Sequence, residues 1–407
     1  MTSSDEVSRP HQPGAASAAL PPYHRGLFVL SVVLVVATFI LVASGGLVTS
    51  RHAGMAVPDW PTSFGRWLLL PVWLWSDLAV MLEHNHRLKG ALGGILAIAM
   101  AAGCLKIIGW RTAVTKLAVA VLVLYIVQGV MGGLRVSEVS RTLAVIHGVF
   151  GQLVFACTVL VAVMCSHWWL SRRRAVKAGV PMTARAGAVS RPMVVFAWLL
   201  VAVLVGQLAL GAVLRHYGGA PAIPDAPAVY GGILPPGDRA TLEQQFEALG
   251  GSRFVYPVDD PQAPPDAIER GERIDVLGGA EFVAAAPPTW AMVWTHYAHR
   301  VGAMVLLPVL LVGLLICVRR EHPVSESLRR PAIWLLVLFA IQVLLGFAVI
   351  WSQRHPEIAT GHQALGAAIL GVAVLIVARA SRARACPITV AADQPEPRRQ
   401  APKVEVA

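Results

Sequence analysis

The sequence has few charged residues and few cysteines for its length. Of its 407 residues, 14% are charged, against roughly 25% in an ordinary soluble domain. This scarcity excludes a soluble globular enzyme and a charge-rich disordered chain. Five cysteines, none of them between residues 49 and 80, are too few for a disulfide scaffold. The sequence is instead 56% hydrophobic with a mean hydropathy of +0.62, which predicts a polytopic membrane protein.

Eight segments are long enough to cross a bilayer core of about 30 Å once their polar entrances are included. They are residues 27–48, 83–105, 117–134, 142–166, 193–214, 290–318, 332–353 and 358–378. We therefore expect an all-α integral membrane protein with eight transmembrane helices.

The positive charge reports topology in such a protein. The formal net charge is +11. Because the positive charge follows the predicted topology, it gives no reason to expect a nucleic-acid partner. With a cytoplasmic N-terminus, the inner segments carry 21 Lys and Arg residues and the outer loops carry 10. This asymmetry predicts that both termini are cytoplasmic. Residues 1–26 contain Asp5 and Glu6 and few arginines, unlike a transit peptide, so we expect a multi-pass protein of the bacterial inner (plasma) membrane.

The two halves of the sequence resemble each other. Arg51-His52 closes the first span and Arg215-His216 closes the fifth. Because each half contains four spans, both halves have the same orientation, and the pattern predicts two pseudo-symmetric four-helix bundles. The predicted organisation is a cytoplasmic tail at 1–26, a first bundle at 27–167, a basic cytoplasmic linker at 168–192, a second bundle at 193–379 and a tail at 380–407.

An insertion at residues 217–289 interrupts the second bundle. It holds 11 acidic and 4 basic residues, together with 11 prolines and 10 glycines, and is too polar to span a membrane. Residues 241–249 are expected to form a short helix. Two interpretations of the insertion stay open, a surface loop or a lid over a site on the outer face.

Four histidines occupy matching places near the outer ends of the even-numbered spans. A single histidine in a membrane helix most often packs and hydrogen-bonds, whereas four repeat-related ones favour a functional role. Two imidazoles on facing helices at one depth can hold a haem iron from both sides. Zinc and a proton relay are the alternatives, although no cysteine or carboxylate cluster completes a zinc site in each half. The histidines are His86, His147, His299 and His362.

Glu83 distinguishes the two halves. It precedes His86 by three residues and shares its helix face, whereas the matching position before His299 is His296. Glu83 is a candidate acid/base group, and its structural alternative is an ion pair with Arg87. Arg87 and Arg300 follow the two histidines and are candidates to contact haem propionates or lipid phosphates.

These residues resemble those of the haem A synthase family over roughly residues 27–380, apart from the insertion. Each motif alone is weak, but the combination is specific. The motifs are Gly-Gly-Leu-Val-Thr-Ser at 45–50, Gly-Met-Ala-Val-Pro-Asp-Trp-Pro at 54–61, Glu-x-x-His-Arg at 83–87, His147, His299-Arg300 and Gly-His-Gln at 361–363.

The resemblance implies an oxidoreductase that converts haem O to haem A for cytochrome c oxidase, by oxidising a porphyrin ring methyl to a formyl group. It implies a haem b cofactor held by His299 and His362. It also implies that His86 and His147 face the substrate haem and that Glu83 assists the oxidation. Some members carry a cysteine pair in the first outer loop, which this sequence lacks.

The implied partners are haem O as substrate, haem A as product and the lipid bilayer. Haem O synthase, cytochrome oxidase assembly proteins and an unidentified electron partner are further expectations, and a homo-oligomer stays open. The main alternative function is a b-type membrane cytochrome or haem-binding assembly factor without catalysis. A small-molecule transporter, suggested only by the repeat, is a third hypothesis.

Overall fold

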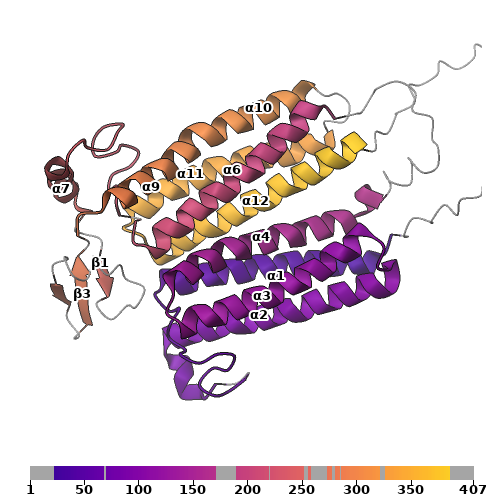
Figure 1. Ribbon diagram of the computed structural model, residues 1–407, viewed down its shortest axis with the longest axis horizontal. Helices are drawn as coiled ribbons and strands as arrows, with labels where there is room; N and C mark the ends of the chain where they lie inside the picture. Colours follow the sequence, from indigo (N-terminus) through magenta and orange to yellow (C-terminus); the bar gives the residue numbers. More distant parts are fainter. Residues whose placement is uncertain are drawn as a thin grey trace, which may run out of the picture.

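The computed structural model describes residues 23–67, 70–170, 189–219, 221–251, 255–257, 273–276, 280–284, 286–320 and 326–385. Most of the predicted basic linker and most of both predicted tails lie outside these residues. Within the described residues, eight helical segments are long and apolar enough to cross a membrane, as predicted. The predicted all-helical membrane region is confirmed, and Figure 1 shows its helices lying side by side.

The helices extend a few residues beyond the apolar segments because polar side chains cap them. Asp77 accepts hydrogen bonds from the backbone of Ala79 and Val80 at the start of the second span, and Ser140 caps the fourth span in the same way. The spanning helices are α1 (Arg25–Ser50), α2 (Leu78–Gly103), α3 (Ala113–Ser137), α4 (Arg141–Cys165), α6 (Arg191–His216), α9 (Trp290–Val301) continued by α10 (Leu307–Arg320), α11 (Glu326–Trp351) and α12 (Pro356–Ala385).

Two spans contain a π-helical turn. One, η2 (Cys104–Ile108), ends the second span. The other, η4 (Gly302–Leu306), joins α9 to α10 and begins three residues after His299. Gly302 leaves room for the Gln207 side chain, since a Cβ atom at this position would lie 1.6 Å from Gln207 Nε2 and would force that side chain to move. Single π-helical turns of this kind are frequent at functional sites.

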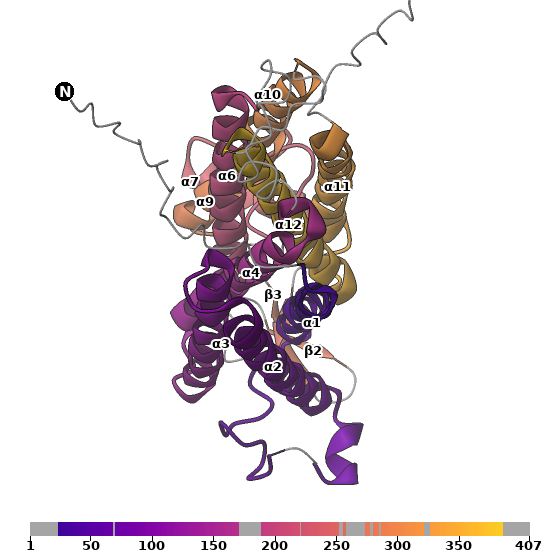
Figure 2. The ribbon, with the colours of Figure 1, turned by 90° about the vertical axis from the view of Figure 1, so that its right-hand side faces the viewer.

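Two cores of buried apolar side chains hold the helices together. One lies among α1, α2, α3 and α4, and the other lies mainly among α6, α10, α11 and α12. The two groups meet where α12 packs on α1 and α4, and where α6 packs on α4 (Figure 2). Large apolar side chains elsewhere face outward, among them Ile95, Ile126 and Val309, each at least 60% exposed. This exposure suits a lipid environment.

The described parts of the loop between α1 and α2 and of the insertion lie at the same end of the helices (Figure 1). This end is called here the loop end. A 3₁₀ helix, η1 (Val72–Ser76), precedes α2 at this end. The expected short helix in the insertion is confirmed as α7 (Arg239–Ala248), capped by Asp238. A small sheet in the insertion was not predicted. Its central strand β3 (Ala280–Ala284) pairs antiparallel with β1 (Val255–Pro257) and β2 (Arg273–Val276).

The insertion packs on the membrane helices rather than standing free. Leu242 and Phe246 of α7 and Tyr230 of the preceding segment are buried in a cluster that includes Val293 of α9. This cluster fixes residues 221–251 against the entrance of the sixth span. Residues 221–251 of the insertion are therefore folded over the loop end.

Candidate functional site

The four predicted histidines lie in the loop-end parts of four different helices. Each imidazole packs its Cε1 edge against a glycine of a neighbouring helix, so that a Cβ atom at the glycine would crowd or touch the ring. The absence of a side chain at these glycines provides the space that the rings occupy. The pairs, with the distance from such a Cβ to Cε1, are His86 with Gly45 at 2.8 Å, His147 with Gly132 at 3.0 Å, His299 with Gly211 at 3.5 Å and His362 with Gly346 at 3.2 Å.

The histidines form two pairs, one in each half. His86 and His147 are close enough to interact electrostatically, and so are His299 and His362. The Nδ1 atoms of His147, His299 and His362 are buried without a hydrogen-bond partner among the described residues, whereas His86 Nδ1 lies 3.0 Å from Ser44 Oγ. Buried polar atoms in a purely structural role are normally satisfied. An unpartnered ring nitrogen is compatible with a ligand role, and His296 Nδ1 shares this state.

Glutamines fix the helix backbone at two of the histidines. Gln128 Nε2 donates to the carbonyl oxygen of His147 at 2.7 Å, and Gln342 Nε2 donates to that of His362 at 3.0 Å. Each bond joins the histidine's helix to the preceding helix of its half. The glycines and glutamines together hold paired imidazoles in small spaces between helices, an arrangement that fits a haem iron ligated from both sides.

Glu83 is buried and both of its carboxylate oxygens accept hydrogen bonds. Oε1 accepts from Arg87 Nη2 at 2.8 Å, and Oε2 accepts from the backbone N–H of Val57 at 2.9 Å. The ion pair with Arg87 considered from the sequence is thus present. In the other half, Arg300 Nε donates to His296 Nε2 at 3.2 Å. The halves therefore share one framework but differ in chemistry at this position, with a carboxylate in one and an imidazole in the other.

Arg87 and Arg300 fold two equivalent loops. Arg87 donates to the carbonyl oxygens of Val57 and Thr62, both at 2.8 Å. Arg300 donates to those of Ile223 and Ala228, at 2.9 and 2.8 Å. Ile223 follows Val57 by 166 positions in the sequence, and Ala228 follows Thr62 by the same 166 positions. These guanidinium groups are engaged by backbone carbonyls, and their contact with propionates stays a prediction.

Two aspartates complete these loops in the same way. Asp59 accepts hydrogen bonds from the backbone of Phe64 and Gly65, at 2.6 and 2.9 Å. Asp225 accepts from Tyr230 and Gly231, at 2.9 and 2.7 Å. Phe64 and Tyr230 both adopt a φ of 53°, a left-handed conformation that the aspartate bonds stabilise.

The environment of Asp59 changes its acidity. Burial alone would raise the pKa of Asp59, but the hydrogen bonds from Thr62, Gly65 and Phe64 outweigh it and lower the pKa to about 2. In the other loop, burial raises the pKa of Tyr230, whose hydroxyl donates to the carbonyl of Ala222. The first loop is therefore built on a charged carboxylate, and the second adds a neutral buried phenol.

Sequence reasoning placed Arg215 at a helix end and assigned it no role. The structure buries it between the halves, where it donates to Gln363 Oε1 at 3.1 Å, to Ser50 Oγ at 2.5 Å and to the carbonyl oxygen of Gly46. Arg51, which matches it in the sequence repeat, is partly exposed and pairs with Glu357. The paired Gly45-Gly46 motif thus contacts His86 on one side and Gln363, the neighbour of His362, on the other.

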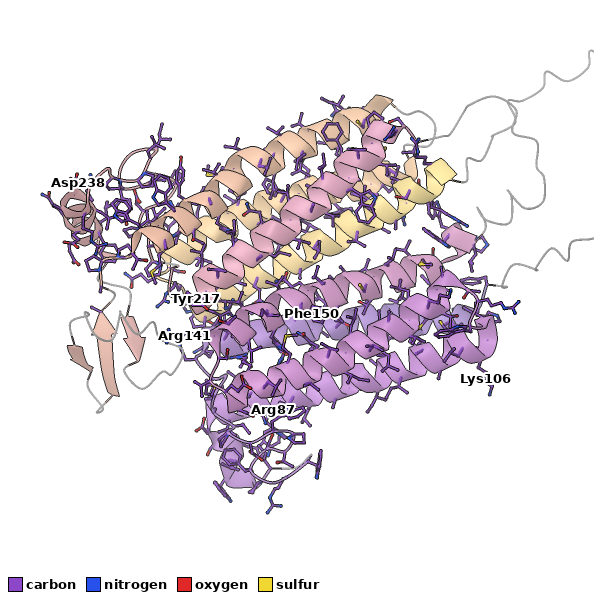
Figure 3. All side chains as sticks on the ribbon, viewed as in Figure 1. Arg87, Lys106, Arg141, Phe150, Tyr217 and Asp238 are labelled. Atoms are coloured by element: carbon purple, nitrogen blue, oxygen red, sulfur yellow. The ribbon has the colours of Figure 1, made fainter. Side chains whose placement is uncertain are left out.

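The loop end is also where the two halves meet near the surface. Figure 3 places Arg141 and Tyr217 there, with Arg87 at the same end and Lys106 at the opposite end. Thr142 Oγ1 and the Tyr217 hydroxyl share a hydrogen bond at 2.9 Å. The functional candidates of both halves therefore lie at one level of the helices.

Comparison with known proteins identifies the family of this chain. Residues 75–374 match the COX15-CtaA family, described as cytochrome oxidase assembly protein. A Heme A synthase from Symbiobacterium thermophilum is 24% identical over 305 residues, covering 74% of this chain and 78% of that protein.

Two further relatives match shorter stretches. A Heme A synthase from Alkalihalophilus pseudofirmus is 26% identical over 143 residues, 35% of this chain and 47% of that protein. One from Shouchella clausii is 29% identical over 140 residues, 34% of this chain and 45% of that protein. The family match covers most of the eight helices and both histidine pairs, and the chain therefore belongs to the COX15-CtaA family of cytochrome oxidase assembly proteins, as a multi-pass membrane protein.

Proposed function

We propose that this protein acts in haem A biosynthesis for cytochrome oxidase, as an oxidoreductase that converts the ring methyl of haem O to a formyl group. The family and the relatives named Heme A synthase support the pathway. The observation that carries the reaction is the difference between two otherwise repeated sites. Glu83 supplies a carboxylate next to one histidine pair, and the other half has His296 at that place.

In this proposal His299 and His362 hold a haem b cofactor. Gly346 leaves space for the His362 ring, and Gly211 lies in contact distance of the His299 ring. The Nδ1 atoms of both histidines are buried without a hydrogen-bond partner among the described residues, which is compatible with a ligand role. When bound, haem b supplies one-electron redox chemistry. His86 and His147 face the substrate haem in the other half.

Glu83 would act on the substrate as a proton acceptor. With water as the oxygen donor, oxidation of a methyl to a formyl group releases four protons and four electrons. A carboxylate beside the methyl group would accept protons as they leave, while an external electron acceptor takes up the electrons. Arg87 and the Val57 N–H fix the carboxylate in one position, which limits the reorganisation needed during the reaction. The folded loop that carries Val57 also covers this carboxylate, which is 4% exposed.

We further propose that the protein lies in the bacterial inner membrane with both termini cytoplasmic. The excess of Lys and Arg in the segments at the end opposite the loop end supports this orientation. The histidine pairs would then lie in the outer part of the bilayer.

The test is the identity of the haems made in cells. The protein is produced in a host that supplies haem O, and membrane haems are extracted and identified by mass spectrometry. In cells that produce the protein, we expect haem A or its hydroxylated precursor. In the same host without the protein, we expect haem O and neither product.

A second candidate function is a haem-binding assembly factor without catalysis. One observation favours it: both Glu83 oxygens already accept hydrogen bonds within the protein. Two reducible haems in the purified protein, with no oxidised product under conditions where a relative makes haem A, would establish this function instead.

A further inference from the structure

Arg135 lies next to the His86–His147 pair and has no role in the proposed reaction so far. It is in the last turn of α3, at the loop end. Gln128, Gly132 and Arg135 follow each other at helical spacing on one face of α3. Two of them contact His147. Gln128 donates to the carbonyl oxygen of His147, and Gly132 lies beside the His147 ring. Because helical side chains lean toward the N-terminus of their own helix, Arg135 leans back toward His147.

The guanidinium of Arg135 has unmet donors. Its Nε and Nη2 atoms are buried without a hydrogen-bond partner among the described residues. Glu83 is close enough to attract it, but the Glu83 oxygens are occupied by Arg87 and the Val57 N–H. A buried charge with unmet donors is costly, so its retention calls for a ligand that pairs with it.

The surroundings of Arg135 add positive charge. Arg215 is buried nearby and repels it, and the Arg215 donors are directed to neutral oxygens of Gly46, Ser50 and Gln363. No carboxylate is hydrogen-bonded to either guanidinium among the described residues. The region beside His86 and His147 therefore carries buried positive charge with unmet donors, which favours an anionic group.

We infer that Arg135 binds a propionate carboxylate of the porphyrin held between His86 and His147. This inference rests on the proposed function only in taking the ligand of that half to be a haem. Guanidinium and carboxylate groups match in geometry and form strong paired hydrogen bonds. A lipid phosphate offers similar anionic oxygens, but only the porphyrin brings its carboxylates to a fixed distance from an iron ligated by these histidines.

The repeat-equivalent position in the second half carries no charge. Gln342 and Gly346 of α11 correspond to Gln128 and Gly132 of α3 through their contacts with His362. The position that corresponds to Arg135 is then Val349. Arg135 is thus a difference between the two halves at this helix position.

The test compares a porphyrin with and without free carboxylates. Iron protoporphyrin and its dimethyl ester are titrated into the full-length protein in zwitterionic lipid nanodiscs, after purification with whatever haem the second half retains. We expect the wild-type protein to bind the free acid about 10-fold to 100-fold more tightly than the ester, the effect of a charged hydrogen bond. Arg135→Gln should bind both with the affinity of the ester.

Arg51→Gln is the matched control. It removes one positive charge from the same end of the helices, at a partly exposed residue paired with Glu357, and should keep the preference for the free acid. The inference is overturned if Arg135→Gln keeps that preference, or if the wild-type protein shows none, as it would if a lipid phosphate occupied Arg135.

A stability measurement separates ligand binding from a structural role. Since its Nε and Nη2 atoms have no partner among the described residues, Arg135→Met should leave the thermal midpoint measured without added porphyrin unchanged or raise it, while reducing the stabilisation by added iron protoporphyrin. A lower midpoint without porphyrin would show that Arg135 supports the fold and would contradict the inference. Both measurements read binding alone, so they stand even if no haem A is formed.

Discussion

Adding one methyl group at Gly132 should disturb the His86–His147 site and leave the helix intact. A Cβ atom there would lie 3.0 Å from His147 Cε1, compared with about 3.5–4.0 Å for carbon atoms in good contact. The ring must therefore shift by a few tenths of an ångström. The His147 backbone cannot follow easily, because Gln128 holds its carbonyl oxygen, so the shift falls on the ring.

The expected magnitude follows from two opposing effects. Overpacking a tight contact costs about 1–3 kcal/mol, whereas alanine favours a helix over glycine by about 1 kcal/mol. The stability of the haem-free protein should change little. Haem binding requires the His147 ring in its original place. Haem affinity should therefore fall about 5-fold to 100-fold.

Gly129→Ala is the matched control on the same helix. No atom of the described residues that could make a contact lies within 4 Å of a Cβ atom at Gly129, so this variant gains the helix preference without the contact. Both variants are purified, and haem affinity is measured by absorbance titration with thermal unfolding alongside. Equal haem affinity in Gly132→Ala and Gly129→Ala would refute the reasoning, since it would mean that the contact does not position His147.

Two further predictions concern the loops. Arg300→Gln removes hydrogen bonds to Ile223 and Ala228, each worth about 1.5–3 kcal/mol, so limited proteolysis should cut the 221–251 segment faster while bound haem is retained; haem loss with an intact segment would instead indicate a propionate contact. The pKa of Asp59, lowered to about 2, means that its stabilisation is complete above the unfolded value of about 3.9 and is lost as pH falls toward 2. Protease resistance of the first loop should therefore decrease across that interval, and Asp59→Asn should remove this pH dependence; an unchanged acid profile in Asp59→Asn would contradict the assignment.

The spans and the histidines could be predicted because they depend on local patterns. Apolar length locates the helices, and the predicted segment 27–48 differs from α1 by two residues at each end. The second span begins at Leu78, five residues before the predicted start, because Asp77 caps an apolar turn that precedes the polar residues at 83–87. The spacing of the histidines within each half likewise reflects a repeat that survives in the sequence.

The partners of the arginines could not be predicted, because they depend on how distant segments pack. Arg51 and Arg215 end equivalent spans, yet one is partly exposed and the other bridges the two halves. Arg135 lies just beyond the predicted span 117–134, but it belongs to α3, and its Nε and Nη2 donors are buried. The small sheet in the insertion also escaped prediction, since three short strands among many prolines and glycines leave little periodic signal.

Haem extraction from cells that supply haem O tests the central claim most directly. The wild-type protein, Glu83→Gln and the control Glu357→Gln, whose carboxylate is about half exposed, are compared at equal membrane levels, and haems are identified by mass. The account predicts haem A with the wild type and the control. Glu83→Gln should yield haem O alone while it retains the absorbance spectrum of haem b. Haem A from Glu83→Gln at the wild-type level would remove Glu83 from the reaction, and unconverted haem O from the wild type, where a relative makes haem A, would contradict the proposed function.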